Sequence, residues 1–418
     1  MSRSVIKLAV VGGGPKAAAL AAKADALART SGSRFAITVF EPLEIGANWA
    51  GNEGYTDGRQ PLCTPSERDI GFPYRSGASA DLFLMEHYSW PRYCVENRTY
   101  SRWVDKGCQP ASHSVFSAYL KWVVGKSTAE VVRAAVVRAT VQRGMWKLTV
   151  KQGKSTTTWD EGFDGLVITG PGPPRRVPGI VKHRDVFDGR SFWLNRESIK
   201  ARLRPGTPET QIVVIGGGGA AAAILAWLCR NGFGDNETQL VADQAALFSR
   251  GESVFENSIF TNDNLWKKMS IENRNAFFER LNRGVVWNSV MSELEKYEQL
   301  SLVEGRAVDV RAGKRKELKV LVHHGNATRS LLPCSMVVDA SGFDTWWFTS
   351  MFSGVAGARR WGSESRAALQ KNMRDTLDFS WKLPPVHVPN LSSAVGPGFG
   401  SLMCLGDMAD RVLSRYLR

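Results

Sequence analysis

Residues 5–24 read VIKLAVVGGGPKAAALAAKA, an apolar run followed by glycines and then by an alanine-rich segment. The apolar run is rich in β-branched residues and predicts a buried strand, whereas the alanines favour a helix. A further apolar run, FAITVFE at residues 35–41, ends in Glu41. This order of strand, helix and strand predicts a β-α-β unit.

The glycine turn within this unit has the spacing Gly12-x-Gly14-x-x-Ala17. In such a fingerprint the first glycine makes a tight turn, the second lets the backbone approach a pyrophosphate, and the small third residue lets the helix pack on the strand. The helix N-terminus faces the anion, and an acid after the next strand, here Glu41, accepts hydrogen bonds from a ribose. Because all these parts are present, the segment predicts a dinucleotide-binding fold.

A second unit of the same kind begins with the apolar run QIVVI and the turn Gly216-x-Gly218-x-x-Ala221. The next apolar run, TQLVA, lacks a clean terminal acid, and Arg250 lies close after it. An arginine in place of the acid favours a cofactor with a 2′-phosphate. We therefore predict that NADPH binds to the second unit, with Arg250 as a ligand of its phosphate.

Small-residue turns follow two further apolar runs, at residues 167–170 (VITG) and 338–342 (VDASG). In flavoproteins with two dinucleotide domains, comparable turns mark the points where the chain crosses between domains. We therefore expect FAD in the first fold and a nicotinamide in the second, and so nicotinamide-driven flavin chemistry.

The predicted fold class is α/β, with two Rossmann-like dinucleotide-binding domains (FAD and NADPH) and a smaller substrate-binding region. We assign residues 1–170 and 331–418 to the FAD-binding domain. Loops at residues 46–75, rich in Gly, Asp, Asn and Pro, are expected to contribute the substrate site. Residues 171–330 are assigned to the NADPH-binding domain.

Composition restricts the other classes of function. The chain has 418 residues and a formal net charge of +14, but its Lys and Arg are spread out and no nucleic-acid-binding motif accompanies them. None of the six cysteines form a C-x-x-C pair and no H-x-x-x-H pair occurs, so neither a disulfide reductase nor a metal site is expected. No apolar segment is long enough to span a bilayer, so we expect a cytoplasmic protein. Assembly into a homo-oligomer is left open.

Several stretches, taken together, carry a more specific signal. They are VVGGGPKAAALAAKA (10–24), GANW (46–49), GYTDG (54–58), ERDIGFPY (67–74), YSW (88–90), RGESVFENSIF (250–260), DASGF (339–343), WFTSMFS (347–353), GPGF (396–399) and LGDMADRVL (405–413). In combination they resemble the lysine/ornithine N-hydroxylating flavin monooxygenases, and the resemblance extends over nearly the whole chain.

The resemblance implies N-hydroxylation of the side-chain amine of an amino acid, with L-lysine as the preferred substrate and L-ornithine next. It implies that NADPH reduces FAD, that the reduced flavin takes up O2 as a C4a-hydroperoxide, and that the neutral amine attacks the distal oxygen. The partners are then a small-molecule amine and O2, in siderophore or related natural-product biosynthesis. The protein mainly positions these partners and excludes water.

The resemblance also implies roles for polar residues at the substrate. In the family a lysine before an aspartate holds the substrate carboxylate, and the matching segment here is E-R-D, so Arg68 stands at the lysine position. Arginine keeps the cation but differs in length and shape. An asparagine in a phenylalanine-x-asparagine stretch holds the same substrate and corresponds to Asn257. A second family asparagine, near substrate and nicotinamide, has Asn288 as its nearest counterpart, although the surrounding motif differs.

Two residues are expected near the flavin by the same resemblance. Trp49 matches a family tryptophan beside the cofactor. Asp407 and the helix that follows it are expected to approach the flavin from the C-terminal end, where a helix N-terminus stabilises negative charge.

Alternatives remain at this stage. Arg68 leaves room for another primary amine, such as a diamine or a modified amino acid, and a carbonyl-oxygenating flavin enzyme is a further reading. The turn GGGGAAAA is bland where the resembled enzymes have a polar residue. A flavin-binding protein without turnover is therefore the alternative from outside the enzymes.

Overall fold

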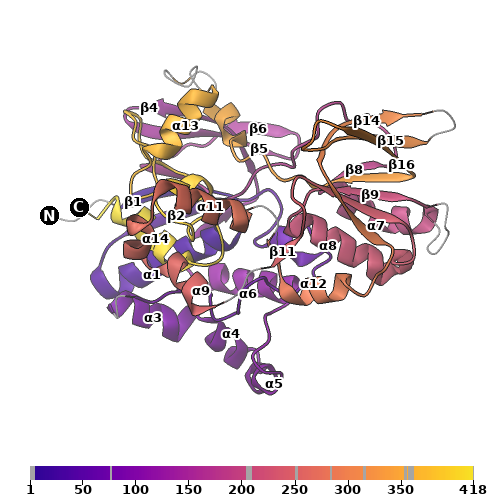
Figure 1. Cartoon of the computed structure of the whole chain (residues 1–418). Coiled ribbons are helices and arrows are strands. Elements are labelled where there is room, and N and C mark those ends of the chain that lie inside the picture. The colour runs from indigo at the N-terminus through magenta and orange to yellow at the C-terminus, as the bar shows by residue number, and fades with distance from the viewer. Residues whose placement is uncertain are drawn as a thin grey trace.

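In the computed structural model, two α/β units lie next to each other, each built around a parallel sheet (Figure 1). The C-terminal helix α14 (Leu405–Ser414) belongs to the first unit. The structure describes residues 5–75, 78–203, 210–249, 253–282, 285–313, 317–352, 355 and 362–417.

The sheet of the first unit has the strand order β18, β7, β1, β2 and β3, with all neighbours parallel. Strand β1 lies in the middle, and its residues Leu8, Ala9 and Val10 are fully buried. A parallel strand covered on both faces needs an uninterrupted apolar run, which explains this sequence. The strands are β1 (Ile6–Val11), β2 (Phe35–Phe40), β3 (Glu130–Val132), β7 (Gly165–Ile168) and β18 (Val386–His387).

Helix α1 (Pro15–Ser31) follows the first glycine turn and forms the centre of the helical layer. It begins after Gly14 with proline in its first position, and it ends at Gly32, whose backbone is left-handed (φ 69°). Its alanines from Ala17 to Ala26 are buried, so the helix axis lies close to the sheet. Helices α3 (Ser79–Tyr88), α6 (His113–Lys126) and α14 pack against α1.

A buried ion-pair cluster joins helices α1, α3 and α14 of this layer. The Lys23 ammonium group on α1 lies 2.6 Å from Asp81 Oδ1 on α3 and 2.9 Å from Asp410 Oδ1 on α14. Lys23 is only 1% exposed, so its charge depends on these two carboxylates. A buried cation is tolerated when it is paired in this way, and the pair sets how the three helices fit together.

The sheet of the second unit has the parallel order β13, β10, β9, β17 and β8. Helices α7 (Ser191–Arg202), α8 (Gly219–Leu228) and α12 (Asn288–Leu294) contribute apolar side chains to one core of this unit. An antiparallel sheet of β14, β15 and β16 contributes to the other. The strands are β8 (Val186–Asp188), β9 (Ile212–Ile215), β10 (Thr238–Ala242), β13 (Leu300–Glu304), β14 (Arg306–Ala312), β15 (Leu318–His323), β16 (Arg329–Cys334) and β17 (Met336–Asp339).

Smaller elements complete both units. An antiparallel sheet of β4, β5 and β6 belongs to the first unit, where Trp146 and Leu148 join its core. The elements are α2 (Ala47–Ala50), α4 (Trp90–Glu96), α5 (Tyr100–Asp105), β4 (Ala135–Gln142), β5 (Met145–Gln152), β6 (Ser155–Thr158), a π-helical turn (Cys229–Phe233), β11 (Phe248–Ser249), β12 (Val285–Val286), α13 (Ser363–Lys371) and two 3₁₀ helices (Trp347–Phe352, Pro389–Ala394).

One segment leaves the second unit and packs on the first. Helices α9 (Val254–Thr261), α10 (Asp263–Lys268) and α11 (Ile271–Asn282) lie between β11 and β12 in the chain. Phe260 and Phe277 from this segment join the core of the first unit, and Asp263 forms an ion pair with Arg411 of α14. Figure 1 shows α9 and α11 beside α14, away from α8. We call residues 254–282 the crossing segment.

The sheet pairing corrects two predicted boundaries. Strands β16 and β17 belong with the second unit, so the chain returns to the first unit at the turn after Asp339 and not at residue 331. The crossing segment packs on the first unit although it lies within the range assigned to the NADPH domain. The boundary at residue 331 was placed before the VDASG turn, which is where the chain crosses. The crossing segment was assigned to the wrong unit because apolar periodicity does not tell which core a helix joins.

A search of the described helices for one long and apolar enough to cross a membrane finds none.

Replacing Lys23 by Met should lower the free energy of unfolding by about 3–5 kcal/mol, because Asp81 would stay buried without its cation. Urea denaturation followed by tryptophan fluorescence would measure this loss. The matched control is Lys121→Met, whose ion pair with Glu44 is at the surface and should contribute less than about 1 kcal/mol. Equal losses in the two variants would contradict a structural role for the buried pair.

Candidate active site

The first glycine turn is shaped for a pyrophosphate. Gly12 has φ of +102°, and a side-chain carbon on it would lie 2.7 Å from Thr169 Oγ1, so only glycine fits. A carbon built on Gly14 would meet no atom within 4 Å, which leaves open space directly before α1. Ala17 is fully buried against the sheet. The turn therefore offers an open, positive helix N-terminus for a phosphate, as the fingerprint predicts.

Glu41 follows β2 beside this turn. Its Oε2 accepts a hydrogen bond of 2.8 Å from the Gly13 amide, and its Oε1 accepts one of 3.0 Å from the Leu43 amide. These bonds fix the carboxylate next to the turn while it remains half-buried. A cavity of about 340 Å³ opens just beyond it and is lined by residues that include Pro42, Ala50 and Arg133. This arrangement fits the adenosine end of a dinucleotide.

The second glycine turn repeats this design in the second unit. Gly216 has φ of +118°, and a side-chain carbon on it would lie 2.4 Å from the Ala340 carbonyl oxygen. Gly218 precedes the first residue of α8, and Ala221 is 1% exposed against the sheet. The predicted phosphate ligand Arg250 lies outside the described residues.

The loops at residues 46–75 lie between the two turns. The Gln60 side chain donates a 3.3 Å hydrogen bond to the Ala223 carbonyl on α8, and Arg230 lies 3.3 Å from Asp57 Oδ2. Tyr55 also packs edge-on against Phe343, with ring centroids 4.9 Å apart. These loops therefore contact the helix of the second turn as well as the first unit.

Trp49 stands on α2 within these loops. Its ring packs edge-on against His113 at 4.7 Å and against Phe116 at 5.7 Å. Burial lowers the pKa of His113 to about 4, so the imidazole is neutral at physiological pH. Trp49 is half-buried, and the rings that it packs on carry no charge.

Asp69 anchors the backbone next to Arg68. Its carboxylate accepts hydrogen bonds from the Trp90 amide at 2.8 Å, the Tyr74 hydroxyl at 2.7 Å and the Gly71 amide at 3.0 Å. Asp69 is almost fully buried, and this burial raises its pKa to about 6. The network holds the chain rigidly at the position where Arg68 leaves it.

Arg68 extends from this anchor toward the C-terminal loop. Its Nη1 lies 3.0 Å from Met403 Sδ and 3.4 Å from Thr64 Oγ1, and its guanidinium group lies over the Phe72 ring at 5.7 Å. The side chain is half-buried. A guanidinium group carries five donors in a planar fork that matches the geometry of a carboxylate.

Asn257 comes to the same region from α9. One turn further along this helix, the Phe260 carbonyl accepts a hydrogen bond of 2.7 Å from Cys404 Sγ, next to Met403. The loop of residues 396–404 thus lies between Arg68 and the helix that carries Asn257. The Asn257 side chain is half-buried. Arg68 and the helix that carries Asn257, far apart in sequence, therefore contact neighbouring residues of one loop, Met403 and Cys404.

Asp407 stands in the first turn of α14, directly after this loop. Its Oδ2 lies 2.9 Å from Arg75 Nη2, and burial raises the pKa of its carboxyl group. Asn288 does not join the cluster. It begins α12 on the second unit and is exposed, and no hydrogen bond or ion pair in the described part of the chain links it to the first unit.

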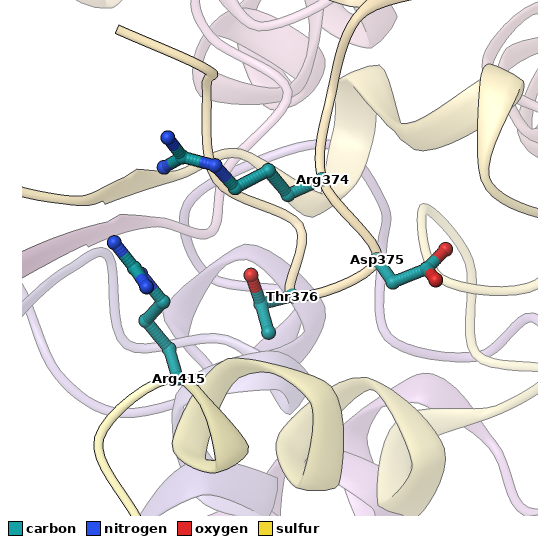
Figure 2. A pocket seen from close by; sticks show the side chains of 4 residues that line it. All are labelled: Arg374, Asp375, Thr376 and Arg415. Atoms are coloured by element: carbon teal, nitrogen blue, oxygen red, sulfur yellow. The ribbon is translucent and has the colours of Figure 1, made fainter. Parts of the chain in front are cut away.

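A different cavity, of about 230 Å³, lies at the other end of α14. In Figure 2 the guanidinium groups of Arg374 and Arg415 lie on the same side, whereas Asp375 points away from them. Both arginines pair with the buried Asp378, at 2.7 Å and 3.7 Å. Arg415 follows the last residue of α14 and Asp407 stands in its first turn, so about 12 Å of helix separates this cavity from the cluster.

Met403, Gln60 and Lys16 are not among the residues predicted from the sequence. Gln60 lies in the loops at residues 46–75 and Met403 lies between two of the quoted stretches, but nothing local distinguishes them. Lys16 carries a signal, because a lysine in the first turn of a helix opposes the helix dipole.

Comparison with known proteins identifies the family of this chain. The family model of L-lysine 6-monooxygenase/L-ornithine 5-monooxygenase matches residues 85–344. The L-lysine N6-monooxygenase MbtG of Mycolicibacterium paratuberculosis is 32% identical over 428 residues, covering 98% of this chain and 95% of MbtG. The chain belongs to this family.

Further relatives agree with the assignment. MbtG of Mycobacterium tuberculosis is 32% identical over 97% of this chain and 94% of its own length. The lysine monooxygenase NbtG from Nocardia farcinica is 29% identical, with a TM-score of 0.80 over 98% of this chain and 100% of NbtG. The ornithine N-hydroxylase KtzI of Kutzneria sp. 744, at 16% identity and a TM-score of 0.74 over 99% of each chain, shares the fold.

The family consists of flavin- and NADPH-dependent N-hydroxylases, and this monooxygenase has the two dinucleotide-binding units that such chemistry needs. Bound FAD, reduced by NADPH, supplies the activated oxygen. The open turn at Gly14 fits a flavin dinucleotide in the first unit, and the turn at Gly216 fits the nicotinamide dinucleotide in the second.

Replacing Gly12 by Ala should yield protein that retains little FAD, because the new methyl group would collide with Thr169 at the turn. The visible flavin absorbance per polypeptide after purification measures this occupancy. Gly125→Ala is a matched control on α6, since its backbone is helical and its added carbon meets no atom within 4 Å. Normal flavin content in the Gly12 variant would contradict the assignment of this turn.

Proposed function

We propose that this monooxygenase hydroxylates the side-chain Nε of L-lysine, with L-ornithine as the second candidate substrate. FAD occupies the turn of Gly12, Gly14 and Ala17, with Glu41 at its ribose, and NADPH occupies the turn of Gly216, Gly218 and Ala221. The MbtG relatives, at 32% identity, carry the name L-lysine N6-monooxygenase, and this supports lysine.

Arg68 is proposed to bind the substrate carboxylate. The proposal is carried by one observation: Arg68 and the helix of Asn257 both contact the loop of residues 396–404. A cation and an amide at opposite sides of one loop match the two polar groups of an amino-acid backbone, a carboxylate and an α-amine. The side-chain amine is then free to extend toward the flavin.

Residues around this cluster are proposed to orient the substrate amine and to exclude water. Trp49 is proposed to form part of the wall beside the flavin, and Asp407 with the N-terminus of α14 to approach the flavin from the other side. Holding the amine in one orientation and keeping water away are the protein's main contributions in such chemistry. We place the reaction in the cytoplasm and, by the resemblance to the family, in siderophore or related natural-product biosynthesis.

The direct test is to incubate the FAD-loaded protein with NADPH and air, separately with L-lysine, L-ornithine, cadaverine, putrescine and L-arginine. Mass spectrometry should find one added oxygen atom on L-lysine, and nuclear magnetic resonance should place it on Nε. Hydroxylation of another member of the panel would replace lysine as the substrate. Failure of NADPH to bleach the flavin would favour the alternative of a flavin-binding protein without turnover.

Replacing Arg68 by Met should raise the KM for L-lysine about 10- to 100-fold, because a charge-assisted hydrogen bond worth about 1.5–3 kcal/mol is lost. Steady-state kinetics of hydroxylated product would measure it. Arg68→Lys should recover part of the affinity, since the charge is kept.

Cadaverine provides the internal comparison, because it lacks the carboxylate. Its KM, if it is turned over, should be much less sensitive to Arg68→Met than that of lysine. Arg59→Met, an exposed arginine in the same loops, is the matched control and should leave the KM for lysine unchanged. An equal effect of Arg68→Met on lysine and cadaverine would argue against carboxylate binding.

A further inference from the structure

Lys16 occupies an electrostatically unfavourable position. It is the second residue of α1, directly after Pro15. The amide groups at a helix N-terminus give this end a partial positive charge, so acidic residues are favoured there and a lysine is not. The first turn of α1 contains no acidic residue that would compensate it. The position therefore needs another source of negative charge.

The Lys16 side chain is also buried without a counter-ion. It is 9% exposed, and among the described residues no carboxylate lies within ion-pair distance of its ammonium group. Lys23, two turns further along the same helix, has Asp81 and Asp410 around its charge. Burial lowers the pKa of Lys16 to about 8, since desolvation acts on it without a compensating charge.

The contact that Lys16 does make lies beside the dinucleotide turn. Its Nζ donates a 3.0 Å hydrogen bond to the Gly400 carbonyl. Gly400 adjoins Asn390, whose amide donates to the Thr169 carbonyl at 3.3 Å, and Thr169 abuts Gly12. Side chains on a helix tilt toward its N-terminus, and Gly14, with open space around an added carbon, directly precedes α1. One carbonyl satisfies only one of the three donors of an ammonium group.

We propose that Lys16 is a ligand of the FAD pyrophosphate, which supplies the negative charge that the polypeptide does not. The ammonium group stays between α1 and the loop of residues 396–404 and pairs with a phosphate oxygen through a free donor. Backbone amides of the turn and a buried lysine then bind the same anion. This inference rests on FAD occupying the first turn.

The test is to strip the flavin and measure binding of FAD and of ADP to the apoprotein by calorimetry, with NADP⁺ present to occupy the second turn. ADP carries the pyrophosphate but no flavin ring. Lys16→Met should raise the Kd of both ligands by the same factor, about 10- to 100-fold, and Lys16→Arg should recover most of the affinity. Lys319→Met, a half-exposed lysine on β15, should change neither value.

Stability of the apoprotein provides an independent readout. Because Lys16 has no acidic partner, Lys16→Met should not lower the unfolding temperature of the apoprotein, but it should reduce the rise that FAD produces. Lys16→Gln keeps a donor for the Gly400 carbonyl without the charge, and it should weaken FAD and ADP binding as Lys16→Met does.

Unchanged Kd values in both neutral variants would overturn the proposal and leave Lys16 as a structural contact to Gly400. Weakened binding of FAD alone would also overturn it, because the ammonium group would then face the flavin ring. Absence of FAD binding by the wild-type protein would instead reject the cofactor assignment itself.

Discussion

Each dinucleotide unit depends on a backbone contact that leaves no room for a side chain. In the first unit the turn at Gly12 rests against Thr169, and in the second the turn at Gly216 rests against Ala340. Thr169 and Ala340 both follow the neighbouring strand, in the turns where the chain crosses between the units. Each glycine turn is therefore held against the turn where the chain crosses between the units.

The C-terminal loop of residues 396–404 connects three functions around that framework. It contacts Lys16 through Gly400, Arg68 through Met403, and the Asn257 helix through Cys404. The Gly400 carbonyl accepts from Lys16, the Met403 thioether accepts from Arg68, and the Cys404 thiol donates to the Phe260 carbonyl. The same loop thus connects the lysine beside the first glycine turn, the arginine proposed to bind the substrate and the helix that carries Asn257.

The local parts of this arrangement could be predicted from the sequence. Gly12, Gly14 and Ala17 with Glu41, and the turn at Gly216, follow from short-range spacing, because the geometry of a strand, a tight turn and a helix is encoded within about twenty residues. The placement of α9 could not be predicted. Its apolar residues fit either core, and only the complementary surface around Phe260 and Cys404 decides between them. Asn288 was matched by region without a motif, and the structure puts it on another helix of another unit.

The crossing segment gives the two units a mechanical link beyond the two crossing turns. It leaves β11, packs on the first unit, and returns at β12, so the strands at its base belong to the second unit while its helices, including the one that carries Asn257, pack on the first. A rigid-body rotation of the second unit would thus pull on both ends of the helices that carry Asn257. Binding of NADPH to the second unit and the position of the Asn257 helix on the first unit would then be coupled. A substitution where the crossing segment joins β11 or β12 would alter both at once.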